Sequence, residues 1–259
     1  MQVFNHFILI LLYTFSIACG STNTQHEMTE TQTLKIASYN VRNAKGMDDV
    51  VDFDRTAKVI NNMDVDAVAI QELDSATQRS NGLIVLDELA KRTNMFASFN
   101  ASIEFSGGKY GNGMLTKEKP LKVEAIALPG REEMRSMLVV ELQDYVVCCT
   151  HLSLNEEDRQ ASIKLIQQFT EKYTTKPVFL AGDFNALPHS EEIKGLSNNW
   201  ILLSDSSQAT FPSDIPTQVI DYIFMKSNGK FNHIIKSAEV VNEPMASDHR
   251  PLWVEVNVD

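Results

Sequence analysis

Short apolar runs typical of β-strands recur along the chain, and several of them lead into a residue that can bind a cation or move a proton. The residues in these positions are Asn40, Glu72, His151 and Asp183, and Asp221 lies within the apolar run 219–224. The densest signal is Asp248-His249, which places an oxygen ligand beside a base that titrates near neutral pH. Because strands of layered α/β proteins present functional groups where they leave the sheet, we expect these side chains to meet at one site.

Strand-like and helix-like segments alternate from residue 34 to the C-terminus. Helices are expected over 53–63, 83–92 and 155–169. Strands are expected at 34–41, 66–70, 95–99, 113–116, 121–128, 136–142, 145–150, 178–181, 219–225, 233–241 and 252–256. The close spacing between 113 and 150 predicts an antiparallel meander, with Gln143-Asp144 as a hairpin turn. Each set of strands must bury one face, which predicts two packed sheets flanked by helices.

The composition bounds the size of the core and the kind of partner. A chain of 259 residues with 43% hydrophobic content fits one large domain, or at most two, with a substantial core. The formal net charge of −11 opposes non-specific binding to the backbone of nucleic acids. This charge favours a small or lipid-borne substrate over long duplex DNA.

The N-terminal segment has the layout of an export signal. Residues 1–18 contain no Lys, Arg, Asp or Glu, and their apolar stretch ends in small residues before Cys19. This junction resembles the cleavage box of bacterial lipoproteins, in which the cysteine carries the lipid. Two departures are that no Lys or Arg precedes the apolar stretch and that Ser16 stands in place of the usual Leu.

We therefore expect a lipidated Cys19, a polar tether over 19–32, and a protein exported to the bacterial cell envelope and anchored to the membrane through this terminus. The alternatives are a plain signal peptide and an uncleaved membrane anchor, although the apolar stretch is short for a spanning helix.

The remaining cysteines, Cys148 and Cys149, are neighbours on one predicted strand. Their side chains should point to opposite faces, where a mutual disulfide would be strained, so we expect two buried small apolar residues. No cysteine spacing typical of a zinc site occurs in the sequence. Oxygen and imidazole groups are therefore the expected metal ligands.

An ordered set of short motifs extends from the first strand to the last. They are Ser38-Tyr39-Asn40-Val41, Gln71-Glu72, Tyr110-Gly111-Asn112-Gly113, Thr150-His151-Leu152, Gly182-Asp183-Phe184-Asn185-Ala186, Ile220-Asp221-Tyr222 and Ser247-Asp248-His249-Arg250-Pro251-Leu252. In this order they resemble the endonuclease/exonuclease/phosphatase superfamily of metal-dependent phosphoesterases. The resemblance implies a catalytic domain over 33–259 with the deoxyribonuclease-I-like α/β fold, a four-layer α-β-β-α sandwich of two mainly antiparallel sheets flanked by helices.

The resemblance also implies a metal site. Glu72 is the strongest candidate ligand, because a carboxylate suits Mg²⁺, with Mn²⁺ as the other possible ion. Asn40 would support the same metal through its amide oxygen, and Asp248 would complete the ligand set or lie just behind it. A surface charge at Glu72 and a turn-capping amide at Asn40 are the structural alternatives.

The other motif residues would carry the chemistry. His249 fits the general base that takes a proton from the attacking water, and Asp221 would orient it. Asp183 and Asn185 resemble the pair that holds the water and a phosphate oxygen. His151 would stabilise the transition state or protonate the leaving oxygen.

Three residues are candidates for substrate binding. Asn112 resembles the amide of the family that contacts phosphate, and Arg79 is a weaker candidate in a polar loop. Arg42 stands where apurinic-type endonucleases of the superfamily carry an acid, two positions after the Asn. This departure argues against a DNA-repair function, and Arg42 would either contact phosphate or lie exposed at the surface.

These features predict a monomeric, metal-dependent hydrolase that acts on a phosphodiester or phosphomonoester such as a lipid or inositol-phosphate headgroup. An exported nuclease acting on nucleic acid is the first alternative. A surface binding module that retained the fold and lost catalysis is the second, although the intact set of motif residues argues against it.

Overall fold

A computed structural model describes Met1 and residues 31–227 and 229–259. The expected export signal, Cys19 and nearly all of the tether lie outside the described residues. Within the part that is described, none of the helices combines the length and the apolar character needed to cross a bilayer.

Twelve strands and four α-helices make up the body of residues 31–259 in its described part. The helices are α1 (Phe53–Met63), α2 (Val85–Thr93), α3 (Glu156–Thr170) and α4 (Glu191–Leu196), with one 3-10 turn, η1 (Arg42–Ala44). The strands are β1 (Gln32–Asn40), β2 (Ala67–Ser75), β3 (Phe96–Phe105), β4 (Gly108–Thr116), β5 (Lys122–Leu128), β6 (Arg135–Glu141), β7 (Val146–His151), β8 (Val178–Asp183), β9 (Trp200–Leu202), β10 (Asp221–Lys226), β11 (His233–Val240) and β12 (Leu252–Val258).

The strands form two six-stranded sheets that follow the same plan. The orders are β11-β12-β1-β2-β4-β3 and β5-β6-β7-β8-β10-β9. Each sheet has one parallel pair at its centre, β1 with β2 and β7 with β8, and its other neighbours are antiparallel. The carboxyl ends of these central strands are where the sequence places Asn40, Glu72, His151 and Asp183.

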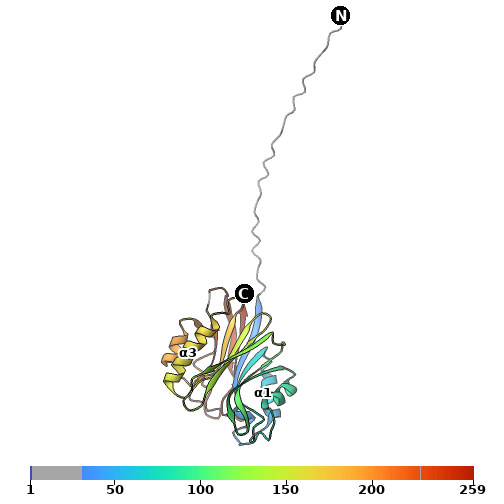
Figure 1. Ribbon diagram of the computed structural model, residues 1–259, viewed down its shortest axis with the longest axis vertical. Coiled ribbons are helices and arrows are strands. Elements are labelled where there is room, and N and C mark those ends of the chain that lie inside the picture. The colour runs from blue at the N-terminus through green and yellow to red at the C-terminus, as the bar shows by residue number, and fades with distance from the viewer. Residues whose placement is uncertain (2–30, 228) are drawn as a thin grey trace. The chain divides into compact units, whose positions relative to one another are not determined.

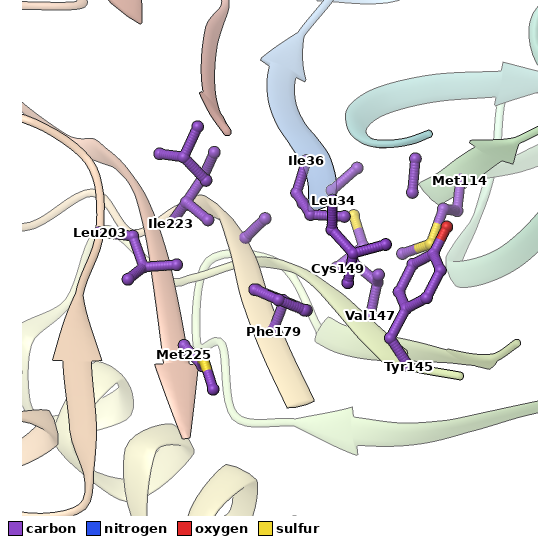
Figure 2. Packing of buried hydrophobic residues seen from close by; sticks show 14 of the residues in the cluster. Leu34, Ile36, Met114, Tyr145, Val147, Cys149, Phe179, Leu203, Ile223 and Met225 are labelled. Atoms are coloured by element: carbon purple, nitrogen blue, oxygen red, sulfur yellow. The ribbon is translucent and has the colours of Figure 1, made fainter. Parts of the chain in front are cut away.

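Three apolar clusters hold four layers together. The first lies between the sheets, where Leu34 and Ile36 of β1 pack with Val147 of β7 and Phe179 of β8 (Figure 2). The second joins α1 and α2 to the outer face of the first sheet, and the third joins α3 and α4 to the outer face of the second. In Figure 1 the helices labelled α1 and α3 accordingly lie on opposite sides of the sheets. The predicted α-β-β-α sandwich of two mainly antiparallel sheets is confirmed.

Local sequence explains where the main helices begin. Asp52 precedes α1, and its carboxylate accepts the backbone N–H of Arg55. Asn155 precedes α3 and accepts the N–H groups of Glu157 and Asp158, whose acidic side chains suit the positive end of the helix. The adjacent cysteines face opposite ways, as expected, because Cys149 belongs to the cluster between the sheets and Cys148 to the cluster under α3.

The predicted meander over 113–150 is wrong in its first strand. β5, β6 and β7 form the meander, but β4 pairs with β2 and β3 in the other sheet. The chain crosses between the sheets after Thr116, and the short spacing to the next strand concealed this crossing. Two short elements, α4 and β9, were not predicted; they are six and three residues long.

Replacement of Phe179 by alanine should lower the free energy of unfolding by about 3–5 kcal/mol, because its ring is fully buried between the sheets and packs edge-on against Tyr145. Urea denaturation of the purified protein measures the loss. Phe96→Ala is the matched control, since 47% of Phe96 is exposed on the edge strand β3. Equal losses for the two variants would contradict the assignment of the core.

Candidate active site

Strand register brings the predicted site residues to one end of the sandwich. In the second sheet His151 is the parallel partner of Asp183, and Asp221 is the antiparallel partner of the same residue. In the first sheet Asn40 is the partner of Gln71, next to Glu72. A Cβ on Gly182 would lie 2.0 Å from the carbonyl oxygen of Thr150, so only glycine allows β7 and β8 to pair this closely here.

The carboxylate of Asp183 is the centre of the site, and it is 1% exposed. Its Oδ2 accepts a hydrogen bond from Asn40 Nδ2 at 3.1 Å and lies 3.4 Å from His151 Nε2 and 3.7 Å from His249 Nε2. Its Oδ1 accepts the backbone N–H of Asn185 at 2.9 Å. One carboxylate therefore contacts groups from both sheets.

His249 is held from two sides. Its Nδ1 lies 2.9 Å from Asp221 Oδ2, which also accepts a 2.6 Å hydrogen bond from Thr210 Oγ1. The ring of Phe211 packs on the imidazole with centroids 4.8 Å apart. Asp221 thus fixes the orientation of His249 and leaves Nε2 directed toward Asp183.

Glu72 has an unusual backbone conformation for its position in a strand. Its φ of 62° lies in the left-handed region, and the pairing of β2 with β4 is irregular between Ile70 and Leu73. Such a conformation costs a non-glycine residue roughly 1–3 kcal/mol and is typical of functional sites. The irregularity brings the Glu72 carboxylate to Asn40, whose Nδ2 donates to Glu72 Oε1 at 3.0 Å.

The two histidines have opposite pKa shifts in the protein alone. Burial lowers the pKa of His151 to about 4, and the nearby charge of Asp183 only partly opposes this. Burial also acts to lower the pKa of His249, but the carboxylates of Asp221 and Asp183 outweigh it and raise the pKa to about 10. At neutral pH, His249 is therefore a cation and His151 is neutral before any ligand binds.

The acidic groups of the site suit a cation. Burial raises the pKa of Glu72, and the charges of Asp248 and Asp183 raise it further. Asp221 Oδ1 is buried and has no hydrogen-bond partner in the described structure. Ligand atoms of Asp183, Asp221 and His249 lie within 4.8 Å of one another. These groups could hold a divalent metal ion, because carboxylate and imidazole donors are common ligands of such ions.

The expected ligand set of Asn40, Glu72 and Asp248 differs from this geometric cluster. The amide of Asn40 turns its nitrogen toward Glu72 and Asp183, whereas its oxygen accepts the backbone N–H of Arg42 at 3.1 Å. Coordination through the oxygen of Asn40 would require its amide to turn over. Asp248 borders the site and lies 3.7 Å from the Nε of Arg42. The roles of all three residues stay predictions.

The expected phosphate-contacting residues lie around this centre. Asn112 is buried in β4 and donates to the backbone oxygen of Ser136 at 3.0 Å, so it joins the sheets beside the partner of His151. Asn185 donates its amide to the backbone oxygen of Leu152 at 2.9 Å. Arg42 and Arg79 line a cavity of about 420 Å³ together with Glu72, and the guanidinium of Arg79 pairs with Asp74.

Several residues that build the site have no predicted role. Ser247 donates to the backbone oxygen of Asn40 at 2.7 Å, which ties the loop of His249 to the end of β1. Ser247 lies inside the C-terminal motif, and this position is the signal that could have identified it. Thr210 and Phe211 come from an irregular loop with no periodic pattern, so their contacts with Asp221 and His249 depend on tertiary structure alone.

Replacement of Asp221 by asparagine should lower the pKa of His249 well below 10, because Asp221 makes the largest of the contributions that raise it. A raised folded-state pKa stabilises the protein below about pH 6.5, and this contribution disappears as the pH rises through the folded value. The variant should therefore also lose part of its stability near pH 6. NMR titration of the imidazole in EDTA measures the pKa. Asp214→Asn, an exposed acid of the loop that precedes β10, is the control, and equal pKa values of His249 in the two variants would refute the pairing.

Comparisons with known proteins agree with this geometry. Residues 37–249 match the model of the endonuclease/exonuclease/phosphatase family. Among solved structures, the endonuclease/exonuclease/phosphatase of Bacteroides vulgatus aligns with a TM-score of 0.72 and 18% identity, covering 88% of this chain and 100% of that chain. A mannosyl-6-phosphatase of Bacteroides thetaiotaomicron gives 0.70 and 17%, with coverage of 86% and 99%. D. rerio TDP2 complexed with a single-strand DNA product gives 0.69 and 18%, with coverage of 87% and 99%.

These identities show a common fold, and no curated protein matches the chain significantly. The family match is more specific, since it extends from β1 to His249 and includes nearly every motif residue of the site. The chain belongs to the endonuclease/exonuclease/phosphatase family.

Proposed function

We propose that the chain is a divalent-metal-dependent phosphoesterase that hydrolyses a phosphodiester or phosphomonoester by in-line attack of water. Mg²⁺ is the proposed ion, with Mn²⁺ as the alternative. The observation that carries the proposal is that His151 and His249 both lie within 3.7 Å of the Asp183 carboxylate, at the end where Glu72 and Asn40 also lie. Family membership supports a hydrolase of phosphoric esters.

Each side chain has a chemical task in this proposal. Glu72, Asn40 and Asp248 would hold the metal, which would supply positive charge to stabilise the phosphoryl oxygens. Asp183 and Asn185 would position the attacking water, and His249 would remove its proton. His151 would assist the leaving oxygen. Asp221 would stabilise the imidazolium of His249 once the proton has moved.

The pKa directions of the free protein run against these roles, and ligand binding explains how they would change. His249 must be neutral to act as a base, yet its pKa is raised by neighbouring carboxylates. Positive charge placed among those carboxylates would lower that pKa. An anionic phosphoester near His151 would raise the pKa of this second imidazole. His249 would then be closer to neutral and His151 closer to protonated, as their roles as base and acid require.

The proposed substrate is a small phosphoester, such as a lipid or inositol-phosphate headgroup. The net charge of −11 supports it, because it disfavours a long nucleic-acid strand. The similar fold of a mannosyl-6-phosphatase is consistent with a phosphomonoester. The alternative is a nuclease, and the similar fold of a protein solved with a single-strand DNA product keeps it open. A binding module without catalysis is disfavoured by the intact set of motif residues.

Hydrolysis should depend on a divalent metal and on both histidines. We expect activity on a panel of sphingomyelin, phosphoinositide, sugar phosphate, nucleotide and DNA to disappear in EDTA and to return with Mg²⁺. Glu72→Gln, His151→Ala and His249→Ala should each reduce kcat/KM by about a hundredfold or more, as expected for loss of a metal ligand or a proton-transfer group.

His233→Ala is the matched control for these measurements. His233 begins β11 opposite Val258, at the other end of the sheet from the candidate site, so its loss should not change turnover. Activity that persists undiminished in both His151→Ala and His249→Ala would exclude the proposed roles. Full activity in EDTA would exclude the metal.

We also propose that the mature protein is a monomer anchored to the bacterial envelope through a lipidated Cys19, a proposal that rests on the sequence alone. Mass spectrometry of the N-terminal peptide from membranes should find a diacylglyceryl-modified Cys19. Cys19→Ser should release the protein from the membrane fraction. An unmodified N-terminus at another residue would exclude lipidation.

A further inference from the structure

A cavity of about 420 Å³ beside the candidate site gathers positive charge in an otherwise acidic protein. Glu72 lines it together with Arg42, Lys45 and Arg79, while Asn43 and Val51 complete its wall. Three cations thus meet one carboxylate, and that carboxylate belongs to the proposed metal site. The lining thus carries three cations to one carboxylate in a chain whose net charge is −11.

Arg79 is held in a fixed orientation at this cavity. Its Nε and Nη2 donate to the two oxygens of Asp74 at 2.6 and 2.8 Å, and Asp74 is fully buried. The face of its guanidinium packs over the rings of Phe105 and Tyr110, at 4.6 and 5.5 Å. A bidentate pair and an aromatic contact restrict an arginine far more than either alone.

Part of Arg79 stays free to bind a ligand. Its side chain is 46% exposed, and its Nη1 makes no hydrogen bond within the described part of the chain. Asp74 lies two residues after Glu72 on the same strand, so β2 positions both the acid of the proposed metal site and the arginine of the cavity.

Two of the lining cations, Lys45 and Arg42, already hold an anionic oxygen between them. Oδ1 of Asp49 lies 2.9 Å from Lys45 Nζ and 3.6 Å from Arg42 Nη2. The side chain of Asp49 is 73% exposed, and ion pairs in such positions contribute little stability. A ligand anion can therefore replace the carboxylate of Asp49 at small cost.

We propose that this cavity is a second anion-binding subsite, which takes a phosphate group that the substrate carries in addition to its scissile phosphoester. The inference rests on the proposed function and narrows it to substrates with two phosphate groups. Arg79 donates to the second phosphate from the side of β2, and Arg42 and Lys45 donate from the turn after β1. Asp49 occupies the place of this phosphate in the free protein.

A series of alkanediol bisphosphates of increasing chain length, each matched with its monophosphate, tests the subsite. Calorimetric titration in excess Mg²⁺ gives the Kd of each compound, with the His151→Ala background used throughout so that hydrolysis is slow during the measurement. At the chain length that spans both positions, the bisphosphate should bind about tenfold more tightly than its monophosphate, the scale of one charge-assisted contact.

Substitutions in the cavity test which residues cause the preference for the bisphosphate. Arg79→Met and Lys45→Met should each bring the ratio of the two Kd values close to one. Asp49→Asn should increase the ratio, because it removes the competing carboxylate and because asparagine tolerates the left-handed φ of 60° at this position. Arg79→Met leaves the buried carboxylate of Asp74 without its cation and can misfold for that reason. Lys45→Met has no such effect, so it tests the subsite even if Arg79→Met does not fold.

Arg92→Met is the matched control. Arg92 is also paired with carboxylates, Asp54 and Glu88, and also packs over a ring, that of Phe53, but it belongs to α2 and does not line the cavity. A preference absent at every chain length, or retained in both Arg79→Met and Lys45→Met, would overturn the subsite while the proposed hydrolysis stands. Loss of metal-dependent hydrolysis across the whole phosphoester panel would overturn both, because the subsite rests on that function.

Discussion

The buried carboxylate of Asp183 is the contact on which the arrangement of the site depends. It belongs to the second sheet, accepts a hydrogen bond from Asn40 of the first, and lies beside both imidazoles. A buried charge is tolerated only where polar partners surround it, so these contacts fix the relative position of the two sheets at this end. Packing between the sheets supplies most of the stability, whereas Asp183 determines which polar groups face one another.

Much of the fold could be predicted because the long elements have consistent patterns. α1 and α3 combine apolar periodicity with a capping Asp52 or Asn155, and the central strands are apolar throughout. The assignment of β4 to a sheet could not be predicted, because strand pairing is a long-range property that a local pattern does not encode. The short elements α4 and β9 contain too few residues to show a period.

The site was predictable in its residue types and much less in its geometry. Motif order identified Asn40, His151, Asp183 and His249; strand pairing then placed the first three together, and the loop before β12 brought His249 to them. No local signal indicates that Thr210 and Phe211 support Asp221 and His249, or that Asp74 holds Arg79. The opposite pKa shifts of His151 and His249 also depend on which carboxylates each ring meets after folding, and these come from distant strands.

At the left-handed backbone position of Glu72, the residue types that would give greater stability are ones that lack the carboxylate. Glycine or asparagine would adopt a φ of 62° with less strain, so either replacement should stabilise β2 while it removes the carboxylate. Proteins screened only for heat resistance would tend to accumulate such a change. A more stable scaffold that lacks this carboxylate is thus a single substitution away in this chain.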